Sequence, residues 1–250
     1  MTPAIQIQGV SKTYANGTQA LLPVDLTVQA GEFVTLLGAS GCGKSTLLKM
    51  AAGLLEPTDG RLRVGFERIA FVFQEATLMP WARVQANVRL PLDLAQVPRV
   101  EADARVRDAL ELVGLQAFAS HRPRELSGGM QMRVSIARSL VTRPTLLLMD
   151  EPFGALDEIT RHRLDTDLLD LWREHKLTVV FVTHSIYEAV YLSQRVIVMA
   201  ARPGRVVDDV MIDEPHPRRA AFRVSTAFAA HAARLQDALQ RASAAEPAIV

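Results

Sequence analysis

The segment GASGCGKS at residues 38–45 constrains this chain more than any other part of the sequence. It matches the pattern GxxxxGK[ST], follows an apolar run at residues 33–37 and precedes a helical pattern at residues 45–55. Glycines let a loop turn tightly and present its backbone amides without interference from Cβ atoms. The N-terminus of the following helix favours negative charge. A strand, this loop and a helix in succession predict a phosphate-binding loop.

The residues of this loop and the first helical turn have separate expected contacts with a nucleotide. Lys44 is expected to place its charge at the β- and γ-phosphates, and the Ser45 hydroxyl to ligate Mg²⁺. Thr46 can donate a hydrogen bond toward the α-phosphate. Cys42 occupies a free position of the pattern and is interpreted as a small loop residue without a redox role. The backbone amides expected around the phosphates belong to Gly38, Ala39, Ser40, Gly41, Cys42 and Gly43.

Two adjacent carboxylates end a second apolar run, TLLLMDE at residues 145–151. A strand end beside the phosphate loop is where an Mg²⁺-binding Asp is expected, so Asp150 is assigned to Mg²⁺ through a water molecule. Glu151 is expected to orient or activate the attacking water. A pair of solvated loop acids is the alternative, and the uninterrupted apolar run before them argues against it.

The pattern along the chain predicts an α/β protein. Residues 5–8 and 21–28 alternate apolar with polar, which is typical of half-buried antiparallel strands. Short apolar runs fit a mostly parallel sheet covered on both faces, and they lie at residues 33–37, 68–73, 145–149, 178–182 and 196–199. Helical patterns lie between them, at residues 45–55, 101–115, 130–141 and 157–175.

We therefore expect a P-loop NTPase core with flanking helices, preceded by an N-terminal antiparallel β subdomain. The expected ATPase domain covers residues 1–217, with a helical insertion at about 75–143. Residues 218–250 form an expected C-terminal helical tail, in which Phe228, Leu235 and Leu239 line a helix that is either docked or frayed.

Composition excludes several other classes of protein. The 250 residues carry 28 Lys and Arg against 27 Asp and Glu, so bulk charge does not favour nucleic-acid binding. One cysteine excludes an internal disulfide and Cys-rich zinc folds. The apolar runs are too short to cross a bilayer, and the start lacks a secretory signal pattern. We expect a cytosolic protein unless a partner holds it at a membrane.

A second glycine-rich segment, LSGGM at residues 126–130, precedes the helical pattern at 130–141. Ser127 is a natural N-cap, and Gly128 and Gly129 expose backbone amides that could bind an anion. By itself this segment is a weak signal, and an ordinary helix cap is the better reading of it.

The combination of motifs resembles the ATP-binding subunit of ABC transporters. GASGCGKS, LSGGM, LLLMDEP and FGALD occur in the order and spacing of that family, and the resemblance extends to about Arg219. The phrases QEATLMPW, DEPFGALDEITR and VTHSIYEAVYLSQRVIVMAARPGR are similar to importers of the nitrate, sulfonate and taurine group, or of thiamine-precursor pyrimidines. Met130 and Ser185 depart from the commonest family residues, and residues 57–67 are expected to form a reduced hairpin.

The resemblance implies a head-to-tail homodimer in the ATP-bound state, with two ATP molecules between its subunits. Ser127, Gly128 and Gly129 of one copy would contact the γ-phosphate held by Lys44 of the other. A single copy would then carry only half-sites.

The resemblance also assigns four further residues, each with a plainer alternative. Tyr14 would stack on adenine, or belong to the core. Gln74 would reach Mg²⁺ or the attacking water, or merely end a strand. Asp157 would cross the dimer interface, cap the following helix, or do both, and His184 would contact the γ-phosphate or be structural.

The same resemblance implies membrane partners. Leu78, Met79, Pro80 and Trp81 would face a cytoplasmic helix of a transmembrane permease, which would hold the chain at the inner membrane. Packing of these side chains inside the subunit is the alternative. A solute-binding protein would act indirectly, and the cargo is left open because its contacts lie on other subunits. Two rival functions are a soluble ABC-type ATPase and a nucleotide-gated module without hydrolysis.

Overall fold

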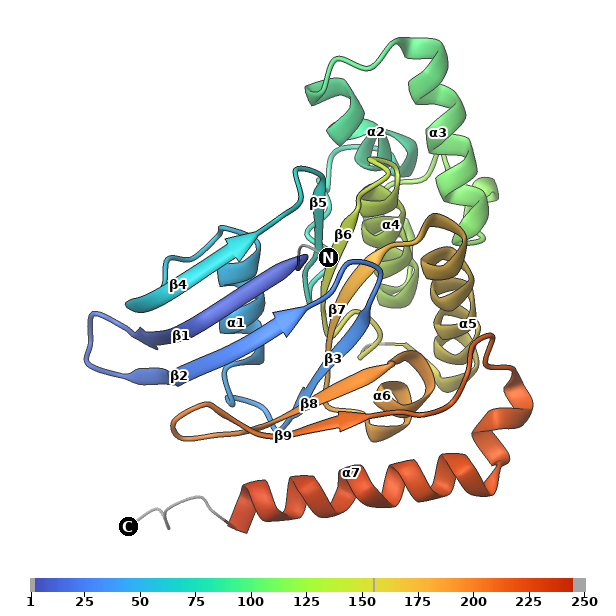
Figure 1. Ribbon diagram of the computed structural model, residues 1–250. Coiled ribbons are helices and arrows are strands. Elements are labelled where there is room, and N and C mark those ends of the chain that lie inside the picture. The colour runs from blue at the N-terminus through green and yellow to red at the C-terminus, as the bar shows by residue number, and fades with distance from the viewer. Residues whose placement is uncertain (1–2, 155, 245–250) are drawn as a thin grey trace.

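A computed structural model describes residues 3–154 and 156–244 of the chain. Residue 155 of the FGALD motif and residues 245–250 of the expected tail lie outside this range. A six-stranded sheet forms the centre of the fold, with the strand order β5-β6-β7-β3-β8-β9 (Figure 1). Its first five strands are parallel and β9 runs antiparallel to β8. The bounds are β3 Phe33–Gly38, β5 Ile69–Val72, β6 Leu146–Asp150, β7 Thr178–Thr183, β8 Arg195–Ala200 and β9 Arg205–Met211.

Every residue of β3, β6 and β7 is buried, as expected for strands of a parallel sheet covered on both faces. All five apolar runs are thus confirmed as strands, and the predicted α/β class is correct. Strand β9 was not predicted. It lies at the sheet edge with polar residues among its apolar ones, so it lacks a continuous apolar run.

A three-stranded antiparallel sheet of order β2-β1-β4 packs beside the central sheet (Figure 1). It consists of β1 Ile5–Thr13, β2 Gln19–Val28 and β4 Asp59–Val64, which confirms the predicted N-terminal antiparallel strands. The hairpin expected at residues 57–67 was wrong, because this segment supplies the single strand β4, paired with β1. Leu62 and Val64 alternate along β4 and pack against the core, which fixes one strand in place of two.

Seven α-helices lie in the described ranges: α1 Lys44–Ala51, α2 Val84–Leu94, α3 Arg99–Leu112, α4 Gly128–Leu140, α5 Glu158–His175, α6 Ile186–Leu192 and α7 Thr226–Ala244. The helical patterns are confirmed with bounds shifted by a few residues. Helix α6 was not predicted, because it spans only seven residues. Helix α2 lies in the segment 75–143 that was expected to be helical, but it had no pattern of its own because it contains Pro91.

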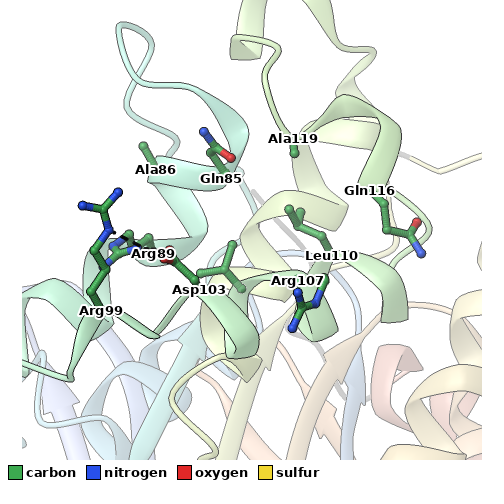
Figure 2. A pocket seen from close by; sticks show the side chains of 10 residues that line it. Gln85, Ala86, Arg89, Arg99, Asp103, Arg107, Leu110, Gln116 and Ala119 are labelled. Atoms are coloured by element: carbon green, nitrogen blue, oxygen red, sulfur yellow. Dashed lines mark hydrogen bonds and ion pairs between the residues drawn. The ribbon is translucent and has the colours of Figure 1, made fainter. Parts of the chain in front are cut away.

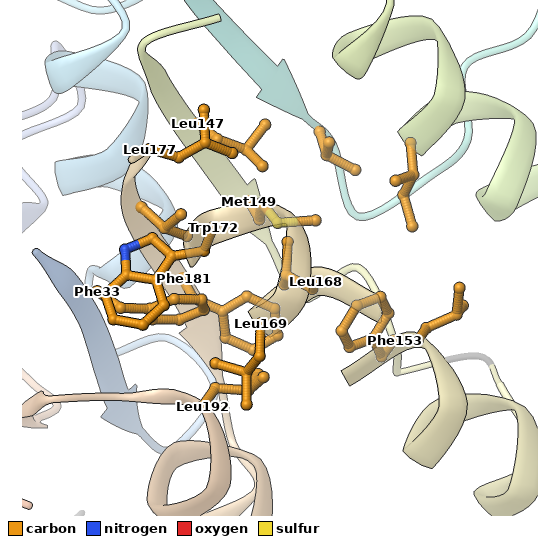
Figure 3. Close-up of a cluster of buried hydrophobic side chains, with 14 of the residues drawn as sticks. Phe33, Leu147, Met149, Phe153, Leu168, Leu169, Trp172, Leu177, Phe181 and Leu192 are labelled. Atoms are coloured by element: carbon orange, nitrogen blue, oxygen red, sulfur yellow. The ribbon is translucent and has the colours of Figure 1, made fainter. Parts of the chain in front are cut away.

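Alternate residues of β3 enter two apolar clusters on opposite faces of the sheet. Phe33 and Leu37 join α5 on one face, and Val34 and Leu36 join α1 and the antiparallel sheet on the other. The Phe33 ring meets the edge of Trp172 at a centroid distance of 5.9 Å and an angle of 81° (Figure 3). Burial of each such side chain stabilises the fold by roughly 1.5–3 kcal/mol. This packing fixes the strands whose carboxyl ends carry the site.

The C-terminal segment is docked against the core. The buried Arg218 guanidinium donates to the carbonyls of Val190, Tyr191 and Ser193 at 2.7, 3.0 and 2.8 Å. Its desolvation lowers the pKa of Arg218 to about 10. Helix α7 then crosses below β8 and β9 (Figure 1) and buries Phe228 and Leu235 completely. The expected apolar line on this helix is confirmed, with Leu239 half-buried at its end.

Candidate nucleotide-binding site

Three groups of expected site residues follow adjacent parallel strands. Strand β7 lies between β6 and β3 in the sheet. The phosphate loop follows β3, the Asp150–Glu151 pair ends β6, and His184 follows β7. Because parallel strands end at one edge of the sheet, these groups meet there, which is where ligands bind in α/β folds.

The phosphate loop needs glycine at particular positions. Gly41 and Gly43 have φ values of 80° and 87°, in the left-handed region that residues with a Cβ rarely adopt. A Cβ on Gly38 would lie 2.5 Å from the carbonyl oxygen of Met199. Helix α1 begins at Lys44, and no side chain caps its N-terminus at Gly43. Amides of its first turn are thus available to an anion.

Lys44 is buried, with 4% of its side chain exposed, and its ammonium group lies inside the loop. Its Nζ donates to the carbonyl oxygens of Gly38 at 2.7 Å and Ala39 at 3.0 Å, and lies 3.7 Å from Glu151 Oε1. Burial raises the pKa of the neighbouring Cys42 thiol, which favours the neutral thiol over the reactive thiolate. This agrees with the interpretation of Cys42 as a small loop residue without a redox role. A buried ammonium group at this point favours binding of an anion.

Ser45 and Asp150 form a possible Mg²⁺ site. The Ser45 hydroxyl donates to Asp150 Oδ1 at 2.8 Å, and burial raises the pKa of Asp150. Hydroxyl and carboxylate oxygens are ligands that Mg²⁺ prefers, and it usually takes one or two protein ligands together with phosphates. This donor set therefore fits an Mg²⁺ ion bound with a nucleotide. No group of three or more His, Cys, Asp or Glu suited to a metal occurs in the described ranges.

Glu151 contacts the side chains of both Lys44 and His184. Its Oε2 lies 2.9 Å from His184 Nδ1, and with the carboxylate ionised the ring nitrogen is the donor. The Glu151 backbone has φ 46°, held by a hydrogen bond from its N–H to the Val182 carbonyl at 3.0 Å. A left-handed non-glycine residue costs on the order of 1–3 kcal/mol and is typical of functional sites. The structure thus brings together Lys44, Glu151 and His184, as the sequence predicted for one site.

The remaining expected residues lie at exposed positions. Tyr14 is 41% exposed, with its hydroxyl 3.4 Å from Thr46 Oγ1, so the core alternative is wrong. Gln74 follows β5 and is exposed. Asp157 accepts a hydrogen bond from the Thr160 amide at 2.9 Å, which lowers the pKa of Asp157 and caps α5. The capping role that the sequence left open is observed.

The LSGGM segment lies at the start of α4. Ser127 is the N-cap, and its hydroxyl accepts from the Met130 amide at 3.3 Å. Ser127 and Gly128 are exposed and Gly129 is half-buried. Within residues 3–154 and 156–244, no hydrogen bond or ion pair joins these three residues to the phosphate loop. The segment is open to a ligand or partner.

Comparison with known proteins assigns the family. The family described as "ABC transporter" matches residues 21–154, which is more than half of the chain. The chain belongs to the ABC transporter family. It is an ATP-binding subunit of that family and an ATPase, and the expected class is confirmed.

Individual relatives of this ABC ATPase cover most of its length. The aliphatic sulfonates import ATP-binding protein SsuB of Bacillus licheniformis is 44% identical over 225 residues, 86% of this chain and 87% of its own. The bicarbonate transport ATP-binding protein CmpC of Synechococcus elongatus is 42% identical over 233 residues, covering 88% of this chain and 35% of CmpC.

A solved structure shares the fold of this ABC ATPase. The dimeric post-hydrolysis state of the ATP-binding cassette MJ0796 bound to ADP and Pi has a TM-score of 0.78 and 34% identity. The match covers 84% of this chain and all of that one. ABC cassettes thus form dimers that hold nucleotide.

The loop after Gln74 exposes an aromatic side chain. Trp81 is 74% exposed, so the alternative of internal packing is wrong for this residue. The Asn87 amide fixes the loop, because its Oδ1 accepts from the Met79 amide at 2.7 Å and its Nδ2 donates to the Ala82 carbonyl at 3.2 Å. Trp81 of this ABC ATPase is therefore presented on an ordered loop. In the described part of the chain, no helix is long and apolar enough to span a membrane.

A pocket of about 500 Å³ lies between α2 and α3, away from the residues expected to bind the nucleotide (Figure 2). Arg89 occupies its wall and pairs with Asp93 at 2.7 Å and with Asp103. None of the expected nucleotide-site residues lines this pocket.

Sequence reasoning assigned no role to Glu188, or to Thr183 and Arg161, which contact it next to His184. Thr183 and Glu188 are buried, and Arg161 lies 3.5 Å from Glu188. A glutamate inside a seven-residue helix that the pattern did not predict gives no signal of its own.

Proposed function

We propose that this chain is the ATP-hydrolysing subunit of an ABC importer, bound to a permease at the cytoplasmic side of the inner membrane. Its solute would be a small molecule such as a sulfonate, taurine or nitrate. The observation that carries the proposal is the contact of Glu151 with both Lys44 and His184 at the carboxyl edge of the sheet. An anchored carboxylate beside a buried ammonium group suits hydrolysis of a terminal phosphate.

Hydrolysis would use Glu151 to orient a water molecule for in-line attack on the γ-phosphorus. The hydrogen bond from His184 Nδ1 holds this carboxylate in place, and the exposed His184 ring would also contact the γ-phosphate. Lys44 would stabilise the charge that spreads over the phosphate oxygens. Bound Mg²⁺, held by Ser45, Asp150 and Gln74, would supply further neutralisation of phosphate charge.

Two copies of the chain would complete each ATP site. Lys44, Ser45 and Glu151 gather at one edge of the sheet, whereas Ser127 caps a separate helix and is exposed. The Ser127 hydroxyl and the Gly128 and Gly129 amides would bind the γ-phosphate held by a partner copy. Asp157, exposed at the start of α5, would lie at the same interface. ATP would draw the copies together, and hydrolysis would release them.

The permease would dock on the loop that presents Trp81. An exposed tryptophan on an ordered loop is suited to contact with a helix of a partner protein. Trp81→Ala is expected to weaken assembly with the permease while leaving ATP binding unchanged. The names of SsuB and CmpC support import of a small anion.

Transport in reconstituted vesicles tests this function. The chain would be assembled with a candidate permease and solute-binding protein from the same organism, and ATP-dependent uptake of labelled sulfonate, taurine and nitrate would be compared. Uptake of one solute that is lost with Glu151→Gln supports the proposal. Failure of the chain to co-purify with any permease, with ATPase activity intact, would favour the soluble ABC-type ATPase. ATP binding without phosphate release from the assembled complex would favour the nucleotide-gated module.

A further inference from the structure

Glu188 is a buried carboxylate that the proposed mechanism does not use. It lies in α6, is 5% exposed, and has its pKa raised by burial. We infer that Glu188 is a positioning residue that fixes the loop carrying His184 and the loop carrying Asp157 relative to each other. The inference rests on the roles proposed above for those two residues.

The first contact of Glu188 reaches the backbone on both sides of His184. The Thr183 hydroxyl donates to Glu188 Oε2 and accepts a hydrogen bond from the Ser185 amide at 3.0 Å. The Ser185 hydroxyl accepts from the Glu188 amide at 3.3 Å and caps α6. Residues 183 and 185 are thus both tied to Glu188, which restricts the direction of the His184 side chain toward Glu151.

The second contact reaches the loop before α5. Arg161 Nε lies 3.5 Å from Glu188 Oε1, and Arg161 Nη2 donates to the Leu156 carbonyl at 2.9 Å. Leu156 directly precedes Asp157. One carboxylate therefore contacts the two polar groups that hold the neighbours of His184 and Asp157.

If Glu188 only stabilised the fold, its ion pair with Arg161 would be explained. Its position between the loops that carry His184 and Asp157 would not be explained. A buried carboxylate is costly to desolvate, and an apolar side chain of similar size is often no less stabilising. Here Oε2 of Glu188 contacts Thr183 and Oε1 contacts Arg161, and each of these side chains is hydrogen-bonded to a loop of the proposed active site. Reaction rates are sensitive to such placement, since a shift of about 1 Å can reduce turnover on the order of 100-fold.

The test compares Glu188→Ala with Glu188→Gln in the full chain. Glu188→Ala is expected to lower kcat about 10- to 100-fold and to leave KM for ATP within about threefold, because it alters placement and not the phosphate loop. Glu188→Gln keeps an oxygen that can accept from Thr183, so kcat should stay within about fivefold of the parent value. Thr183→Val removes the donor and should reproduce the loss, which covers the case in which Glu188→Ala does not fold.

Thr178→Val is the matched control. Thr178 lies at the other end of β7, is equally buried, and its hydroxyl accepts from the Gly31 amide at 2.9 Å. Loss of this hydrogen bond in Thr178→Val should lower the melting temperature yet leave kcat of the folded fraction within about twofold of the parent value. An unchanged kcat in Glu188→Ala, or losses in all four variants that simply follow their stability, would overturn the inference.

NMR of the histidine ring nitrogens gives a readout independent of turnover. The His184 signal, identified by its absence in His184→Ala, should shift in Glu188→Ala and Thr183→Val but not in Thr178→Val. An unshifted signal in Glu188→Ala overturns the positioning claim. A His184→Ala variant with normal kcat would instead refute the proposed role of His184, while the NMR comparison still decides the claim about Glu188.

Discussion

Replacement of Glu151 by Gln removes a negative charge from the site with little change in shape. The amide oxygen can still accept the hydrogen bond from His184 Nδ1, which is 2.9 Å in length with the carboxylate. Lys44 keeps its two carbonyl acceptors at 2.7 and 3.0 Å. The loop geometry is therefore expected to survive, and any loss of turnover reports on the chemical role of the carboxylate.

The expected loss follows from the role of a general base. Positioned acid–base groups contribute roughly 10²- to 10⁴-fold to rate, which corresponds to about 3–5 kcal/mol of activation free energy. ATP affinity should stay equal or increase, because a carboxylate 3.7 Å from Lys44 Nζ repels the triphosphate and competes for the same ammonium group. Glu151→Gln should therefore bind ATP, turn it over slowly and accumulate the ATP-bound dimer.

Phosphate release and equilibrium binding of a fluorescent ATP analogue measure the two effects separately. Sedimentation velocity with ATP and Mg²⁺ measures the dimer. Glu151→Asp serves as the control, since it keeps the charge and shortens the side chain. Turnover by Glu151→Gln at the parent rate would refute the assignment, and equal loss of binding and turnover would show that the substitution damages the loop.

Substitutions at three further residues test separate parts of the account. Tyr14→Ala should weaken ATP binding by about 1 kcal/mol through loss of stacking, whereas Tyr14→Phe keeps the ring and should bind normally in the same titration. Phe33→Ala should lower the free energy of unfolding by about 3–5 kcal/mol in a denaturant melt, because the ring is fully buried against Trp172. Burial lowers the pKa of His216 from 6.5 to about 4, so its neutral form is the one that favours folding. The contribution of His216 to stability should be fully present above pH 6.5 and be lost as the pH falls toward 4, and His216→Phe should remove this part of the pH dependence in thermal melts.

Local sequence predicted the parts of the site that depend on local conformation. The glycines at residues 41 and 43 are required by backbone angles within the loop itself, so the pattern was sufficient. The acids at the end of β6 followed from an uninterrupted apolar run. By contrast, the contact between Glu151 and His184 depends on β6 and β7 being neighbours in the sheet. The residue patterns alone placed the acidic pair beside the phosphate loop, and the family resemblance was needed to add His184 to the same site.

Elements with weak local patterns could not be predicted. Strand β9 lies at the sheet edge with Arg205, Asp208 and Asp209 among its apolar residues, and α2 continues through Pro91. Single strand β4 was mistaken for a hairpin because its pairing partner, β1, lies about fifty positions earlier in the chain. Glu188 lacked any signal because its importance depends on contacts made by the tertiary fold.

Complementation between two inactive variants tests most directly whether each ATP is held by two copies of the chain. Lys44→Ala and Ser127→Ala would each be inactive alone, because every site in either homodimer lacks one group. A head-to-tail heterodimer joins both lesions in one site and leaves the other site intact. An equal mixture should therefore recover about a quarter of the parent ATPase rate, since half the dimers are mixed and each carries one working site. A mixture no more active than its separate components, or a Ser127→Ala variant that hydrolyses ATP normally as a monomer, would contradict the account.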